Sequence, residues 1–555
     1  MAVAALVCLA AAIGRCAVTY AVDSPPAATQ PVAPPDVEDL LEKARRLEEA
    51  GQWEDALGRY EEIRRLGAGP PGTAEAAERC RRHLRIEARC RSAATRDFAH
   101  ALTASRGLAL YEEALDRISA SYVVETELAP LVLRGLENCL TAARNPLFVR
   151  TYRPQTDPER LARWEAGLVG LERGLSGAVL TPAEGAQLLR QVLRANVETL
   201  ALPDGAVALE MIHGGVEGLD AHSAFLNPER LKSLRTEIDG EFVGLGVRIA
   251  LRDGTVVVVH PIEGGPAERA GVRAGDRLLS VDGRDLEGLT LEEVARLLHG
   301  PAHTPVVIEI LHPGGREPVV LTVRRERVVL RSVTHMRRLG ETRAIGYVRI
   351  TSFQKSTPGE LEEALRQLEG EGIRGLVLDL RGNPGGVLDA AVEVANDFIR
   401  EGIVVTTRGR AWGQNWTFRA RAEGTHPDYP LAVLVDDMSA SATEIAAAAL
   451  KDHRRAVLVG CRTYGKGSVQ SLFTLGRGDV GFRLTTARFY PPGGESFDGT
   501  GIAPDVEVPL ANGARLGEAG GSGPGQDNQL ASALRYLEGR LATGTAGVEG
   551  SSTPK

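Results

Sequence analysis

The stretch from residue 431 to residue 470, LAVLVDDMSASATEIAAAALKDHRRAVLVGCRTYGKGSVQ, constrains the fold of this chain most strongly. Its first five residues, LAVLV, are a short, unalternating apolar run of the kind found in strands that are buried on both faces. The Ala-rich segment that follows has a strong helix propensity and predicts a helix over 442–453. Another apolar run predicts a strand over 455–460. A strand, a helix and a strand in this order predict an α/β sheet, followed here by a glycine-rich loop.

Ser441 occupies the turn between the first strand and the helix, so we expect its hydroxyl at the end of the sheet. The N–H of Ala442 would point, with the positive end of the helix dipole, at an oxyanion beside that hydroxyl. Lys466 follows in a Gly-Lys-Gly sequence after the second strand. Desolvation lowers the pKa of a lysine from ~10.4, by up to ~3–5 units when burial is complete. A neutral amine can then act as general base for a serine nucleophile, and Gln470, on the same strand face, could orient it.

Three other interpretations of this stretch compete with the catalytic one. From four residues alone, a capping box between Ser441 and Glu444 is the stronger interpretation. Ser439 offers a second hydroxyl in the same turn. The sequence GCRTYGK over 460–466 imitates a phosphate-binding loop, but Gly467 stands where that loop needs a hydroxyl residue, and a strand-like segment follows instead of a helix.

The segments SASATEI and YGKGSVQ together resemble the carboxyl-terminal processing (tail-specific) peptidases. That resemblance implies a Ser441/Lys466 dyad supported by Gln470, and it favours Ser441 over Ser439. Thr443 replaces the serine usual in the family, a conservative change. The loop LRGNPGG, over 380–386, resembles the family loop that completes the oxyanion hole.

The resemblance therefore implies an oxyanion hole made by the N–H of Ala442 with that of Gly385 or Gly386. Without the resemblance, a tight turn that serves packing only is an equally good interpretation of this loop. The other polar residues of the loop are expected to be scaffolding: Asp379, Arg381 and Asn383.

Residues 240–326 resemble a PDZ domain. The segment FVGLGVRI predicts a carboxylate-binding loop leading into a strand, and residues 291–298 predict the helix that accompanies it. Backbone N–H groups in such a loop hold a peptide C-terminus while the peptide adds a strand to the sheet. The residues expected to bind the peptide are Gly244, Leu245, Gly246, Val247, Leu291, Val294 and Leu298. A PDZ domain alone implies peptide binding and not proteolysis.

Two further segments extend the resemblance, which covers about residues 105–143 and 205–545. EGLDAHSAFLN matches a family segment, with Ala221 in place of proline; His222 and Ser223 are expected to be a structural connector. GIAPD matches the closing turn. The implied fold class is α/β multidomain: a helical N-terminal region, an inserted PDZ domain (β-barrel-like with two helices), and an α/β peptidase core of the tail-specific protease (crotonase/ClpP-like) type.

The predicted organisation follows from these segments and from composition. The apolar run 2–13 is too short to span a bilayer but suits a signal-peptide core, although a basic n-region is missing. The G-x-W-x-x-A-L-x-x-Y spacing near Gly51 resembles one tetratricopeptide unit, with an isolated helical hairpin as the alternative. The predicted parts are a signal peptide at 1–21, a Pro-rich linker at 22–35, a helical, tetratricopeptide-like region at 36–100, the helical N-terminal region with an insertion at 101–235, the PDZ domain at 239–327, the catalytic core at 328–510, a Gly-rich linker at 511–529, a helix at 530–541 and a tail at 542–555.

Composition narrows the functional classes. The net charge of −8 gives no basic footprint for nucleic acid. Six scattered cysteines show no metal-ligand spacing; Cys80 and Cys90 would be ~15 Å apart on one helix, too far for a disulfide. Cys461 reads as a small buried residue. No metal or organic cofactor is expected, and after signal removal no membrane span.

The leading hypothesis is an exported serine endopeptidase, periplasmic or envelope-associated, that cuts proteins near their C-termini, with protein or peptide substrates that have a free C-terminus as partners. The N-terminal helices could recruit an adaptor. The alternative is a catalytically silent PDZ and helical-repeat scaffold that binds protein C-termini. A Ser/His/Asp hydrolase using His426 or His453 fits less well, because neither histidine lies in a suitable motif.

Overall fold

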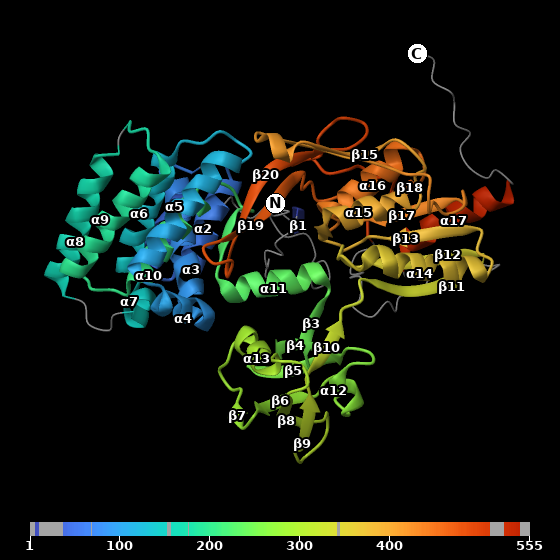
Figure 1. Cartoon of the computed structure of the whole chain (residues 1–555), viewed down its shortest axis with the longest axis horizontal. Coiled ribbons are helices and arrows are strands. Elements are labelled where there is room, and N and C mark those ends of the chain that lie inside the picture. Colours follow the sequence, from blue (N-terminus) through green and yellow to red (C-terminus); the bar gives the residue numbers. More distant parts are fainter. Residues whose placement is uncertain are drawn as a thin grey trace. The chain divides into compact units, whose positions relative to one another are not determined.

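The computed structural model describes residues 6–9, 37–67, 69–152, 157–175, 177–252, 254–340, 344–510 and 527–543 (Figure 1). The chain forms two compact units. The first holds the described residues from 37 to Leu231, together with Gln470–Thr486; the second holds the rest. The predicted Pro-rich linker lies outside the described residues, as do the predicted signal peptide apart from 6–9, most of the Gly-rich linker, and nearly all of the tail.

The first unit is mostly helical. Its helices are α1 (Val37–Glu49), α2 (Trp53–Arg65), α3 (Thr73–Arg91), α4 (Ala93–Ala101), α5 (Ala104–Ser121), α6 (Leu128–Arg144), α7 (Pro146–Tyr152), α8 (Pro158–Arg173), α9 (Pro182–Glu198) and α10 (Asp204–Glu217). The predicted hairpin appears as α1 and α2, with Gly51 at a φ of 72° between them. Helix α3 shares an apolar cluster with both, so this hairpin is not isolated.

A second, larger apolar core joins α5, α6, α9 and α10 to a β-hairpin from late in the sequence. Strands β19 (Ser468–Leu475) and β20 (Val480–Tyr490) form this hairpin, and Phe482 and Leu484 are buried against the helices. The short strand β2 (Ala224–Leu226) pairs antiparallel with β20. Within this unit, residues far apart in sequence are therefore held by one continuous core.

The PDZ-type domain has its own core in the second unit. Its sheet runs in the order β4-β5-β6-β8-β9, so β4 is an edge strand. The elements are β3 (Glu241–Gly244), β4 (Val247–Arg252), β5 (Thr255–Pro261), α12 (Pro266–Arg269), β6 (Arg277–Val281), β7 (Arg284–Asp285), α13 (Leu291–Leu298), β8 (Pro305–Leu311), β9 (Val319–Arg324) and β10 (Glu326–Val329). Strands β3 and β10 pair antiparallel where the chain enters and leaves the domain.

The predicted catalytic core is built on a six-stranded sheet in the order β11-β12-β13-β17-β18-β21, parallel except for β11. Its strands are β11 (Val333–Leu339), β12 (Ile345–Ile350), β13 (Gly375–Asp379), β17 (Leu431–Val435), β18 (Val457–Gly460) and β21 (Val506–Glu507). Strands β13 and β17 are buried at every residue, as the unalternating apolar runs predicted. Burial on both faces requires covering helices on both sides.

The helices of this region supply that cover. They are α14 (Thr357–Gly370), α15 (Leu388–Asn396), α16 (Ala442–Asp452) and α17 (Asn528–Ala542). The C-terminal helix α17 packs Leu530, Leu534 and Leu537 against alternate residues of β12, β13 and β17. Only alternate residues of these strands belong to that cluster, so the side chains between them point to the opposite face of the sheet. Other helices contact the sheet as well: α14 contacts β12, and α16 contacts β18.

The remaining elements lie mainly in the second unit and comprise four strands, one helix and one 3-10 turn. They are β1 (Leu6–Leu9), α11 (Pro228–Asp239), β14 (Gly385–Val387), β15 (Ile403–Gly409), the 3-10 turn η1 (Trp412–Gln414) and β16 (Trp416–Arg419). Strand β1 pairs antiparallel with β14, and β15 pairs with β16 and with the last residues of β20. The expected fold class, helical region, PDZ domain and α/β core, is confirmed.

The half-buried Asp397, which follows α15 and has a buried Oδ2, makes the stability of the core dependent on pH. Burial raises the pKa of Asp397 from 3.8 to about 7, against the lowering effect of His426. Its Oδ2 has no hydrogen-bond partner among the described residues. A raised carboxyl pKa contributes stability that is fully present below the unfolded-state pKa and is lost as the pH rises through the folded-state value.

Asp397→Asn is therefore expected to raise the free energy of unfolding at pH 8 by about 1–3 kcal/mol, and the thermal midpoint with it, and to have little effect near pH 4. Thermal unfolding at several pH values measures this difference. Asp116→Asn, at an exposed position of α5, is the matched control. A gain that does not grow between pH 4 and pH 8 would contradict the assignment.

Candidate active site

Ser441 lies between β17 and α16 in a strained backbone conformation, with φ at 59° and ψ at −115°. Few non-glycine residues adopt such angles, which cost about 1–3 kcal/mol and persist only where the surroundings impose them. The side chain is buried, and Oγ has no hydrogen-bond partner among the described residues. The hydroxyl therefore does not cap the helix, which corrects the capping-box interpretation of Ser441.

Ser439, the other hydroxyl of the turn, is occupied by structural hydrogen bonds. Its Oγ donates to the carbonyl of Leu380 at 2.9 Å and accepts from the N–H of Asp436 at 3.0 Å. Asp436 in turn accepts from the N–H of Gly382 through Oδ1, at 2.9 Å. These bonds join the nucleophile turn to the LRGNPGG loop and leave Ser441 as the unengaged hydroxyl of the turn.

Glu444 connects Ser441 to the segment that carries Lys466. Its Oε2 accepts from the N–H of Ser441 at 2.7 Å and from the N–H of Lys466 at 2.8 Å. Its Oε1 accepts from the N–H of Gly465 at 2.7 Å and from Oγ1 of Thr463 at 2.6 Å. Desolvation raises the pKa of this buried carboxyl, and these four donors oppose that shift. Of the two hydrogen bonds in the predicted capping box, only the one from the N–H of Ser441 to the carboxylate of Glu444 is present. The other three bonds to this carboxylate fix the segment that carries Lys466, a role that the local sequence did not indicate.

Lys466 precedes β19 and its side chain is only 2% exposed. The glycines around it allow close approach to the GIAPD region: the N–H of Gly467 donates to Oδ1 of Asp498 at 3.0 Å, and a Cβ on Gly465 would lie 2.8 Å from the N of Gly501. A strand follows this loop, as expected, and not the helix of a phosphate-binding loop.

Gln470 lies on β19, four residues after Lys466, and is fully buried. Its Nε2 donates to Oγ1 of Thr485 on the paired strand β20, at 3.4 Å. The N–H of Thr485 donates to Oγ of Ser223, which itself donates to Asp220. Ser223 thus belongs to the packing around the β19–β20 hairpin.

The LRGNPGG loop lies directly against Ser441. A Cβ on Gly385 would lie 3.0 Å from Cβ of Ser441 and from the N of Ala442, and φ at Gly385 is 100°. A Cβ on Gly386, where φ is 148°, would lie 1.9 Å from the carbonyl oxygen of Phe353. Both positions therefore require glycine. The N–H of Gly385 donates to Oδ1 of Asn383 at 2.9 Å, so this N–H is used within the loop.

The two histidines of the competing hydrolase hypothesis are engaged elsewhere. His426 has Glu369 at 2.8 Å from Nδ1 and Glu362 at 2.9 Å from Nε2. The Nε2 of His453 donates to the carbonyl of Ile403 at 2.8 Å. Neither arrangement is that of a serine protease base.

The predicted peptide-binding residues of the PDZ-type domain fall into two groups. Gly244–Gly246 link β3 to the edge strand β4, and α13 contacts β4. Leu245, Val294 and Leu298 are buried in the core of the domain, whereas Val247 and Leu291 are partly exposed beside it. In the described part of the chain β4 pairs with β5 alone, and such an edge can accept an added strand.

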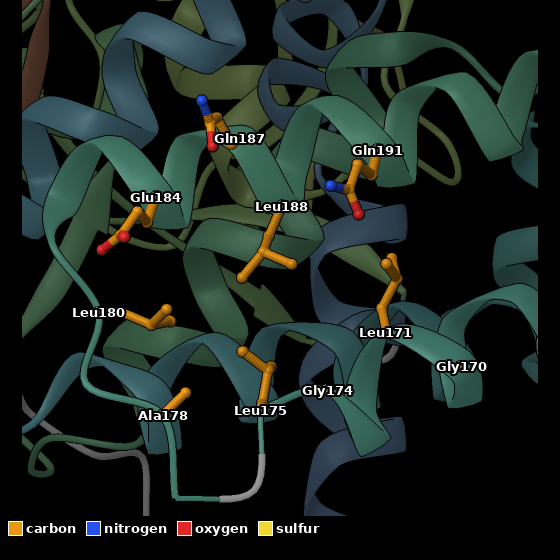
Figure 2. Close-up of a pocket in the computed structure, with 10 residues that line it drawn as sticks. All are labelled: Gly170, Leu171, Gly174, Leu175, Ala178, Leu180, Glu184, Gln187, Leu188 and Gln191. Carbon is orange, nitrogen blue, oxygen red and sulfur yellow. The ribbon is translucent and has the colours of Figure 1, made fainter.

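A cavity of about 310 Å³ lies between α8 and α9, and none of the predicted site residues is among those that line it (Figure 2). Leu175, Leu180 and Leu188 point into it. Cys80 and Cys90 are buried free thiols. Cys461 is also a free thiol but only half-buried, where a buried residue was expected. None of the helices in the described part of the chain combines the length and apolar character that a bilayer span requires.

Comparison with known proteins shows the family of this chain. The model of peptidase family S41 matches residues 344–508, and a PDZ-domain model matches residues 257–312. A carboxy-terminal-processing protease of Bartonella bacilliformis is 38% identical over 320 residues, which are 57% of this chain and 73% of that protein. A carboxyl-terminal-processing protease of Synechocystis is 38% identical over 324 residues, with the same two shares.

Among solved structures, the photosystem II D1 C-terminal processing protease is 28% identical, with a TM-score of 0.38 over 73% of this chain and 93% of that one. The alignments with the two curated relatives cover 73% of each relative's own length. The chain is therefore a serine-type peptidase with a PDZ domain and belongs to the carboxy-terminal-processing protease family.

Proposed function

We propose that this peptidase cleaves proteins near their C-termini with Ser441 as nucleophile and Lys466 as general base. The observation that carries the proposal is the buried, unengaged hydroxyl of Ser441 at a strained turn, tied through Glu444 to the backbone of Lys466. A lysine amine removed from water loses the solvation that stabilises its charged form, and a neutral amine is what the base must be.

The reaction follows from these roles. Oγ of Ser441 attacks the peptide carbonyl while its proton passes to Nζ of Lys466. The C–N bond then breaks, the leaving amine takes that proton, and an acyl-enzyme remains. Water, deprotonated by the same amine, releases the acyl group. Gln470 holds Lys466 in place for these transfers.

The oxyanion of each tetrahedral intermediate lies on backbone N–H groups. Ala442 supplies one at the start of α16, and the glycine pair supplies the other. Because the N–H of Gly385 is bonded to Asn383, Gly386 is the donor that we propose, and Gly385 provides the space beside Ser441.

The PDZ domain would capture the substrate. The loop Gly244–Gly246 holds the terminal carboxylate, and the tail adds a strand beside β4 with its side chains toward Val247 and Leu291. Leu245, Val294 and Leu298 form the apolar base of that site.

The proposed function also includes export of the protein to the periplasm or cell envelope. Helices α1 and α2 would bind an adaptor.

The test is degradation of an unfolded protein with an apolar C-terminal tail, compared with the same protein carrying an amidated tail. Wild type is expected to cleave the free tail about tenfold faster or more, because the amide removes the charge that the loop would hold. Ser441→Ala is expected to cleave neither. Equal cleavage of both substrates would refute carboxylate capture, and an active Ser441→Ala variant would refute the nucleophile.

A further inference from the structure

Arg381, in the LRGNPGG loop, is 1% exposed, and all five of its side-chain N–H groups are hydrogen bonded. Asp379, at the end of β13, accepts from Nε at 2.9 Å and from Nη2 at 2.7 Å. The other three acceptors come from the start of the C-terminal helix α17. Asp527 accepts from Nη1 at 2.9 Å and from Nη2 at 2.8 Å, and Oε1 of Gln529 accepts from Nη1 at 3.1 Å.

These contacts join α17 to the loop beside Ser441. Asp527 also caps its own helix, since Oδ1 accepts from the N–H of Leu530 at 3.0 Å. Gln529 is anchored on its other side, where Nε2 donates to the carbonyl of Val508 at 2.8 Å. The segment from Asp527 to Gln529 is thus fixed to the sheet before it meets the guanidinium.

The other end of the LRGNPGG loop is fixed by the turn that carries Ser441. Asn383 accepts from the N–H of Gly385 through Oδ1, and its carbonyl accepts from the N–H of Ala440 at 3.0 Å. Gly382 donates to Asp436, as described above. The four residues between Arg381 and Gly386 are therefore held between α17 and the Ser441 turn, and a displacement of Arg381 would be transmitted to the glycines.

We propose that Asp527 and Gln529 are positioning residues for the catalytic centre: through Arg381 they fix the loop that places Gly385 and Gly386 beside Ser441. This inference rests on the proposed function, and it makes the docking of the C-terminal helix a condition for an ordered oxyanion hole. A buried arginine deprived of its partners must reorient or draw in water, and either change moves its own loop. A displacement near 1 Å at a reacting centre lowers the rate by about 10²-fold.

The test uses Asp527→Asn in the full chain. Asparagine caps a helix as well as aspartate does, so α17 keeps its cap, but one acceptor facing Arg381 becomes an N–H₂ donor and the charge is lost. We expect kcat to fall about 10- to 100-fold with KM changed less than about twofold. Affinity for a peptide aldehyde, whose adduct places an oxyanion in the hole, should fall in parallel.

Leu534→Ala is the matched control. Leu534 packs α17 against the sheet, and it is not one of the residues that hydrogen bond to Arg381. It should lower the thermal midpoint and leave kcat unchanged below that temperature. Amide hydrogen exchange at Gly382 and Gly385 gives a readout that needs no activity: it should accelerate in Asp527→Asn and not in Leu534→Ala.

The inference would be overturned if Asp527→Asn kept the kcat of wild type and the exchange rates of wild type at these amides. It would also be overturned if the variant lowered the thermal midpoint and changed nothing else. If wild type itself cleaved nothing while exchange at the loop still accelerated in the variant, the proposed function would fail and the link between α17 and the loop would stand.

Discussion

A Lys466→Met variant is expected to lose peptidase activity by about 10³-fold or more while it folds like wild type. Methionine matches the length of the lysine stem and suits a side chain that is 2% exposed, but it cannot accept the proton of Ser441. The hydrogen bonds that hold this position use the backbone N–H of residue 466, which methionine retains. The measurement is kcat/KM on the tailed substrate, with circular dichroism and thermal unfolding as folding checks.

Two further variants sharpen this prediction. Lys466→Arg places a permanently charged guanidinium where the mechanism needs a neutral amine. Because a guanidinium is not deprotonated in proteins, it cannot act as the base, and this variant should be as inactive as Lys466→Met. Lys355→Met, at an exposed lysine paired with Asp239, should retain wild-type kcat/KM. Activity within tenfold of wild type in Lys466→Met would exclude the dyad and leave another group to activate Ser441.

The sequence alone predicted the catalytic scaffold because local patterns determine it. The run 431–435 was expected as a strand and β17 has those bounds; the helix expected from 442 begins there as α16. Hydrophobic runs and helix propensity are properties of neighbouring residues, so they can be read without knowledge of the rest of the chain. Strand β18 begins two residues later than expected, because Arg455 and Ala456 complete the turn after α16.

The polar network of the site was not predictable in the same way. Glu444 stands three residues after Ser441, which indicated a capping box, yet three of its four hydrogen-bond donors lie about 20 residues further on. Arg381 and Asp527 are 146 residues apart. No periodicity connects such pairs; they meet only because the sheet brings strand ends and the C-terminal helix together. Scaffolding was the expected role of Arg381 and Asn383, but which residues they would hold had no local signal.

Glu444→Gln is expected to lower kcat/KM about 100-fold and to lower the thermal midpoint by several degrees. Each oxygen of Glu444 accepts two hydrogen bonds from fixed donors. Glutamine presents one oxygen and one N–H₂ group, so two donors lose their acceptor and meet another donor. With charged acceptors such bonds contribute about 1.5–3 kcal/mol each, and their loss would separate the Ser441 turn from the Lys466 loop.

The comparison of two readouts tells this role from a general loss of stability. Glu423→Gln, at an exposed glutamate, should change neither the activity nor the thermal midpoint. Thr463→Val removes a hydroxyl that donates to Oε1 of Glu444 and accepts from the N–H of Ile502. It should lower stability with a much smaller loss of kcat, because the bonds from Glu444 to Ser441 and Lys466 are kept. If Glu444→Gln lost stability but kept wild-type kcat, the carboxylate would serve only the fold. If both variants lost kcat in proportion to stability, the dyad geometry would depend on overall packing. Only a loss of kcat in Glu444→Gln beyond that of Thr463→Val shows that one carboxylate holds nucleophile and base in register.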